Sequence, residues 1–200
     1  MSSNQADDKS MTQIKMDTAK EKKEIADQAF KAGELKQALR SYHEALMYLV
    51  GIDKTALQGL GMSSPTGGSG EAVDAAASAK QDRTEIDEII EKIYANMAAC
   101  HLKQGNWKRV LETTDKALAK NENNHKAMFR KGKALGELGF FEKAEKILEE
   151  LKKKNPSDAA MVDAELTRLR SADKERQKAH DQKLRGFLSR EKKPTASAAT

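Results

Sequence analysis

Charged side chains four positions apart are the first candidates for a binding site in this sequence. Lys126 and Arg130 stand at i and i+4 within a segment of helical periodicity, so they share one face of a helix. Two like charges at this spacing cost about 0.2–0.5 kcal/mol, and an anionic ligand would relieve that repulsion. Arg130 can contact a carboxylate through two N–H groups, while Lys126 supplies a compact point charge. The pair is therefore a candidate anion site.

Reactive side chains form no catalytic or metal-binding pattern. The histidines at positions 43, 101, 125 and 180 have no metal-ligand spacing with Cys100. The sequence has neither a glycine-rich phosphate loop nor a G-x-S-x-G motif. Cys100 lies in an apolar helical segment, where we expect a small packing residue rather than a nucleophile. We predict a protein that is not an enzyme and that uses no metal or cofactor.

The composition favours a helical protein with a thin core. Of 200 residues, 34% are charged and 4% are aromatic, which is typical of solvated helices rather than a β-sandwich or barrel. The net charge of +5 arises from residues 174–193, so a general basic surface for nucleic acid is not indicated. The sequence shows no signal-peptide core, no apolar run long enough to span a membrane, and a single cysteine. We expect a cytosolic or nuclear protein, cytoplasmic by default, without integral membrane association.

Helical hairpins recur along the chain with a fixed period. The glycines Gly105 and Gly139 are 34 residues apart, and apolar residues at steps of three and four flank each of them. Gly33 takes the same place in an earlier hairpin, 72 residues before Gly105, so 38 residues are inserted between the first two hairpins. Thirty-four is the tetratricopeptide period, and about three such hairpins must stack to bury a core. We predict an all-α fold of three tetratricopeptide hairpins stacked as a right-handed superhelix, plus a long C-terminal helix.

The same patterns divide the chain into segments. Residues 1–18 lack a periodic apolar stripe, which predicts a disordered arm. The repeat domain is predicted over residues 19–156, with repeats at about 19–50, 84–124 and 125–156 and a flexible insertion at about 51–83. A capping and basic helix is predicted over residues 157–190, followed by a disordered tail over residues 191–200.

Two classes of residue are expected to form the repeat core. Small residues let the two helices of a hairpin approach closely, and bulky residues fill the space between neighbours. The small residues are Ala26, Ala38, Ala98, Val110, Gly132 and Ala144. The bulky residues are Leu35, Trp107, Phe140 and Phe141. We expect all of these positions to be covered in the folded domain.

Two stretches of the sequence resemble a known group of repeat proteins. Residues 94–103 and 126–135 are similar to the tetratricopeptide domains of the large FK506-binding immunophilins. Residues 42–46 and 51–53 resemble the short tetratricopeptide repeat protein nine family. The resemblance covers about residues 19–190, and it leaves no space upstream for an isomerase domain. We therefore expect no isomerase activity.

The resemblance implies a peptide site on the first helices of the repeats. In that group of proteins a carboxylate clamp grips the acidic C-terminus of heat-shock protein 90 or heat-shock protein 70. Its positions correspond here to Lys23 and Asp27, to Asn96, and to Lys126 and Arg130. Four of the five residues match the clamp in type. Asp27 departs, because the clamp has an asparagine there.

Asp27 is expected to alter the clamp. An ionised aspartate offers only acceptors, so it repels a carboxylate and can pair with Lys23 at i+4. The implied function is a non-enzymatic, co-chaperone-like adaptor that binds acidic C-terminal peptides through a partial clamp, more weakly or with altered preference. The alternative is a repeat scaffold for a different, internal peptide or a cytoskeletal partner.

The basic C-terminal segment gives a weaker signal. Basic residues surround the apolar Leu184, Phe187 and Leu188. In the immunophilins the final helix has been proposed to contact calmodulin, and a basic helix with few apolar anchors is a weak signal of that kind. Because only three anchors are present, we favour a solvated extension of the last helix over calmodulin binding.

Overall fold

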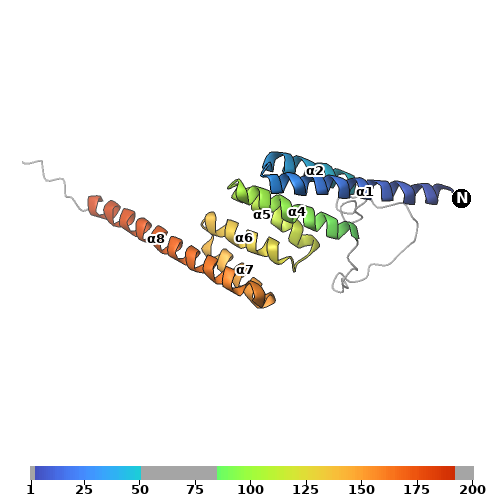
Figure 1. Ribbon diagram of the computed structural model, residues 1–200. Coiled ribbons are helices and arrows are strands. Elements are labelled where there is room, and N and C mark those ends of the chain that lie inside the picture. The colour runs from blue at the N-terminus through green and yellow to red at the C-terminus, as the bar shows by residue number, and fades with distance from the viewer. Residues whose placement is uncertain (1–2, 51–84, 192–200) are drawn as a thin grey trace, which may run out of the picture.

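The computed structural model describes residues 3–50 and 85–191, and within them it contains seven α-helices and no strand (Figure 1). The helices are α1 (Ser3–Ala32), α2 (Leu35–Val50), α4 (Glu85–Lys103), α5 (Trp107–Lys120), α6 (His125–Glu137), α7 (Phe141–Lys154) and α8 (Ala159–Glu191). A short 3-10 turn, η1 (Pro156–Asp158), precedes α8. The predicted all-α fold is confirmed.

Three helix hairpins stack along the molecule. The pairs are α1 with α2, α4 with α5, and α6 with α7, and each hairpin contacts the next through α2 with α4 and α5 with α6 (Figure 1). Gly33, Gly105 and Gly139 form the three turns, with φ of +85°, +69° and +87°. Because residues with a Cβ rarely adopt such φ values, these glycines fix where each first helix ends and its partner begins.

Small residues produce the close packing within and between hairpins. Ala26, Ala38, Ala98, Val110 and Ala144 are fully buried. A methyl group at Gly132 would lie 2.7 Å from Leu148 Cγ, which is closer than van der Waals contact allows. These positions therefore depend on small side chains, as the repeat pattern predicts.

The last helix covers the third hairpin and then continues alone. Val162, Leu166 and Leu169 of α8 are buried, and α8 contacts both α6 and α7. A methyl group at Gly136 of α6 would lie 2.2 Å from Leu169 Cδ2, so the two helices pack very closely there. Beyond residue 173 the described side chains of α8 are exposed, and the helix extends past the hairpins (Figure 1). No described helix is both long enough and apolar enough to cross a membrane.

Two predictions from the sequence are wrong. The predicted disordered arm is helical from Ser3 onward, because its residues include no proline or glycine and each helical residue adds a hydrogen bond to α1. Phe140, expected in the core, is 51% exposed at the start of α7, with the Lys143 ammonium 5.4 Å from its ring centre. The predicted insertion at about 51–83 lies outside the described residues, as does the predicted C-terminal tail from residue 192 onward.

Candidate functional site

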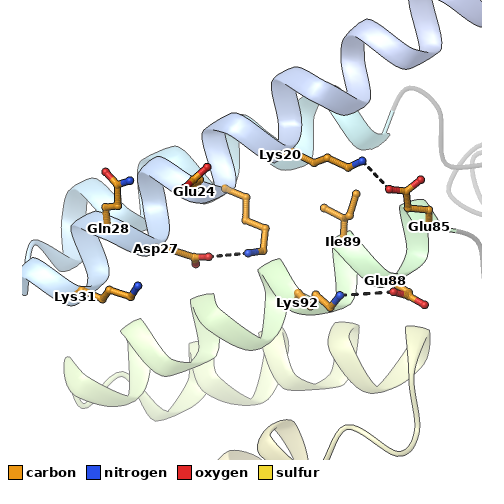
Figure 2. A pocket seen from close by; sticks show the side chains of 10 residues that line it. Lys20, Glu24, Asp27, Gln28, Lys31, Glu85, Glu88, Ile89 and Lys92 are labelled. Carbon is orange, nitrogen blue, oxygen red and sulfur yellow. Dashed lines mark hydrogen bonds and ion pairs between the residues drawn. The ribbon is translucent and has the colours of Figure 1, made fainter.

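The first helices of the three hairpins, α1, α4 and α6, form a continuous surface, since α4 contacts both α1 and α6. Two open cavities lie along it. One, of about 550 Å³, lies between α1 and α4 (Figure 2). The other, of about 530 Å³, is lined by α1, α4, the start of α6 and the turns beside them. Lys23 and Lys92 line both cavities. We call the two together the A-helix groove.

The carboxylate of Asp27 lines the first cavity, and three donors bind it. Lys23 Nζ donates to Asp27 Oδ2 at 2.6 Å, and Asn96 Nδ2 donates to Asp27 Oδ1 at 2.8 Å. The Tyr42 hydroxyl also donates to Asp27 Oδ1. The three donors come from α1, α2 and α4, so Asp27 ties the first hairpin to the second.

The electrostatics of this cluster keep Asp27 ionised and Tyr42 protonated. Burial alone would raise the pKa of Asp27, but the hydrogen bonds from Lys23, Tyr42 and Asn96 outweigh it and hold that pKa below its usual value. Burial, together with the neighbouring Asp27 carboxylate, raises the pKa of Tyr42. At neutral pH the cluster therefore holds one cation and one anion, Lys23 and Asp27.

Lys126 and Arg130 lie on the first turns of α6 in different environments. Asn124 caps this helix, since its Oδ1 accepts from the Ala127 N–H at 2.9 Å, and this fixes the turn that carries Lys126. Lys126 is exposed and lines the second cavity. Arg130 is half-buried, and its Nη1 donates to the Ala95 carbonyl of α4 at 2.9 Å. Burial lowers the pKa of Arg130, although an arginine side chain stays charged at neutral pH.

A buried carboxylate that sequence reasoning missed shapes the edge of the groove. Glu91 of α4 is 7% exposed and lines the second cavity. It accepts from Asn121 Nδ2 at 2.9 Å and from Asn124 Nδ2 at 2.6 Å. Glu91 thereby holds the turn before α6, and with it the helix start that carries Lys126. An acidic residue within an apolar helical run was the one available signal.

Neither a reactive thiol nor a metal site is evident among the described residues. Cys100 is fully buried, and burial raises the pKa of its thiol to about 11, so little reactive thiolate forms at neutral pH. Among the described residues, no group of three or more histidine, cysteine or acidic side chains is arranged to hold a metal ion.

Comparison with known proteins agrees with the hairpin architecture. Residues 101–169 match the family described as tetratricopeptide repeat. The match shows tetratricopeptide repeats over this stretch, which runs from the end of α4 into α8. Among curated proteins, human zinc finger CCCH domain-containing protein 7A is 44% identical over 75 residues, and protein 7B is 35% identical over 75 residues. Each match covers 37% of this chain and 8% of the human protein.

Solved tetratricopeptide structures have the same fold. The C-terminal repeat domain of a putative FK506-binding protein of Plasmodium falciparum aligns with a TM-score of 0.63 at 22% identity, covering 84% of this chain and 95% of that one. The Hsp90 co-chaperone Cns1 of Saccharomyces cerevisiae aligns with a TM-score of 0.63 at 21% identity, covering 88% and 46%. The first repeat domain of Spaghetti (RPAP3), bound to the HSP90 peptide SRMEEVD, aligns with a TM-score of 0.54 at 18% identity, covering 78% and 96%. At these low identities the similarity shows a shared fold.

Within this fold, the five predicted site residues occupy one region. Lys23, Asn96 and Lys126 line the second cavity, Asp27 lines the first, and Arg130 bonds to a residue of the second cavity wall. The predicted pairing of Lys23 with Asp27 is confirmed. Asn96, expected to present its amide to a ligand, instead donates to Asp27. The role of these residues in peptide binding stays a prediction.

Proposed function

We propose that this tetratricopeptide domain is a non-enzymatic adaptor of the co-chaperone type, which binds acidic peptides in the A-helix groove. The first candidate ligands are the acidic C-terminal segments of heat-shock protein 90 and heat-shock protein 70. The observation that carries the proposal is the exposed Lys126 at the start of α6, one turn before Arg130, beside an open cavity large enough for several peptide atoms.

Charge in the groove supports an anionic ligand at this end. Lys23 is neutralised by Asp27, whereas Lys126 has no ion pair within the described residues. One N–H of Arg130 is used by Ala95, and the guanidinium has others to offer. A ligand carboxylate between Lys126 and Arg130 would also relieve the repulsion between these two like charges. In this proposal Lys126 and Arg130 bind the acidic group, while Lys23, Asp27 and Asn96 form a closed network beside it.

The fold likeness makes heat-shock peptides reasonable probes. One similar structure is a repeat domain bound to the HSP90 peptide SRMEEVD, and another is a yeast co-chaperone of Hsp90. Both are less than 25% identical to this chain, so they suggest the probe and do not establish the ligand.

Titration of the protein with the peptide SRMEEVD tests the proposal. A charge-assisted hydrogen bond contributes about 1.5–3 kcal/mol, and Lys126 is exposed, so Lys126→Ala should weaken binding by about tenfold, at the lower end of that range. Lys36→Ala is the matched control, because Lys36 is an exposed lysine of α2 that lines neither cavity of the groove. Affinity should also fall as salt rises, since the charges are partly exposed. Absence of saturable binding, or equal affinity of both variants, would exclude the proposal.

A further inference from the structure

Resting on the proposed binding of acidic peptides, we infer that the A-helix groove holds the interior of an extended acidic segment and does not bind a free C-terminal carboxylate. Asp27 is the residue that makes this selection. Its carboxylate already accepts the hydrogen bonds that a C-terminal carboxylate of a ligand would need. It therefore offers the ligand a hydrogen-bond acceptor and no donor.

The donors near Asp27 are already engaged. Lys23, Asn96 and Tyr42 all donate to its two oxygens. A terminal carboxylate entering here would meet an ionised aspartate, and it could bind these donors only by displacing Asp27. Displacement would leave the Tyr42 hydroxyl, on a fully buried residue, without its acceptor. Repulsion and the loss of these bonds both disfavour a chain terminus at this point.

Asp27 still has capacity for a ligand that donates. A carboxylate has about four acceptor positions, and three donors use them here. The side chain of Asp27 is 29% exposed, so the carboxylate is open to the groove. A backbone N–H of a ligand could fill the remaining position. Interior residues of a peptide carry such an N–H, whereas a terminal carboxylate has no proton to give.

The first cavity of the groove extends along α1 on both sides of Asp27. The first cavity runs along α1 between Lys20 and Lys31, and Figure 2 shows Asp27 between these two lysines, on the side of α1 that faces Ile89 of α4. These two lysines are eleven positions apart, and eleven helical steps span about 16 Å, which is the length of about five extended residues. The second cavity shares Lys23 and Lys92 with the first and reaches Lys126. A bound chain therefore has space to pass Asp27 with its acidic side chains beside Lys126.

Three versions of one peptide test the inference. They are SRMEEVD with a free carboxylate, SRMEEVD with a C-terminal amide, and SRMEEVD extended by Gly-Ser-Gly-Ser and amidated. The wild-type protein should bind all three with affinities within about threefold. Asp27→Asn releases Lys23 and gives the cluster another amide donor, so this variant should prefer the free acid to the amide by at least tenfold. Far-UV circular dichroism checks that the variant is folded.

Each outcome has a distinct meaning. A tenfold or greater loss of wild-type affinity on amidation would overturn the inference while leaving the proposed function intact. Asp27→Asn protein that is folded and shows no preference for the free acid would overturn the role assigned to Asp27. Failure of the wild-type protein to bind any of the three peptides would remove the proposed function, and the inference with it. Comparison of the three peptides on the wild-type protein tests the inference even if the Asp27→Asn variant does not fold.

Discussion

The hydrogen bond between Tyr42 and Asp27 should appear as an energetic coupling between two hairpin elements. Tyr42→Phe removes one donor from a carboxylate that keeps two others, so the free energy of unfolding should fall by about 1 kcal/mol. Asp27→Ala leaves the buried Tyr42 hydroxyl and the Asn96 amide without their acceptor and removes the i, i+4 ion pair with Lys23. An unsatisfied buried polar group costs about 1–3 kcal/mol and the ion pair contributes about 0.3–0.5 kcal/mol, so the loss should be about 2–3 kcal/mol.

A variant that carries both Tyr42→Phe and Asp27→Ala isolates the energy of the Tyr42–Asp27 hydrogen bond from the other effects of each substitution. With phenylalanine at position 42 no hydroxyl is left unsatisfied, so the Asp27→Ala change should cost about 1–2 kcal/mol less in that background. Urea unfolding followed by far-UV circular dichroism at pH 7 measures all four proteins, provided that each unfolds in a single transition. Costs that add to within about 0.3 kcal/mol would refute direct contact between Tyr42 and Asp27.

Two further predictions concern packing and pH. Gly136→Ala places a methyl group 2.2 Å from Leu169 Cδ2, and overpacking of this kind costs about 1–3 kcal/mol, so thermal unfolding should move to lower temperature. Gly186→Ala is its matched control, since nothing lies within 4 Å of a methyl group there; an equal effect of both changes would contradict the packing of α8 on α6. Because the folded protein lowers the pKa of Asp27, the ionised form adds stability above the usual value of 3.8, and this is lost as pH falls through the lowered pKa. The stability difference between wild type and Asp27→Asn, measured by urea unfolding from pH 7 to pH 3, should therefore shrink in acid, and a constant difference would contradict this assignment.

Local patterns predicted the fold and part of the site. The spacing of Gly105 and Gly139 predicted the hairpin turns, because a turn glycine and the apolar steps around it are properties of a short segment. The pairing of Lys23 with Asp27 followed from their separation of four residues on one helix. Both features depend on neighbours in sequence, which periodicity describes well.

The remaining parts of the site depend on contacts between different helices. Tyr42 and Asn96 reach Asp27 from α2 and α4, and their separations from it, 15 and 69 residues, carry no periodic signal. Glu91 likewise acts through Asn124, 33 residues later. Such contacts follow from the angle at which helices stack, which side-chain types alone do not determine.

The helical N-terminal segment shows a different limit of sequence reasoning. The N-terminal part of α1, where the apolar stripe is missing, runs past the end of α2 (Figure 1), and its Met11 and Ile14 are exposed. The missing apolar stripe therefore indicated that this segment packs against little of the protein. It did not indicate that the segment is not helical. The helix continues there from the packed part of α1, which provides its nucleus.

Backbone amide shifts in a two-dimensional nuclear magnetic resonance spectrum, recorded while SRMEEVD is added to the full chain, test the central claim most directly. Binding in the A-helix groove should shift the amides around Asn96 of α4 and around Lys126 and Arg130 of α6, and the same shifts should require more peptide in Lys126→Ala. Amides on the outer helices α5 and α7 should change little. Shifts confined to α5 and α7, or no shifts at millimolar peptide, would contradict the account.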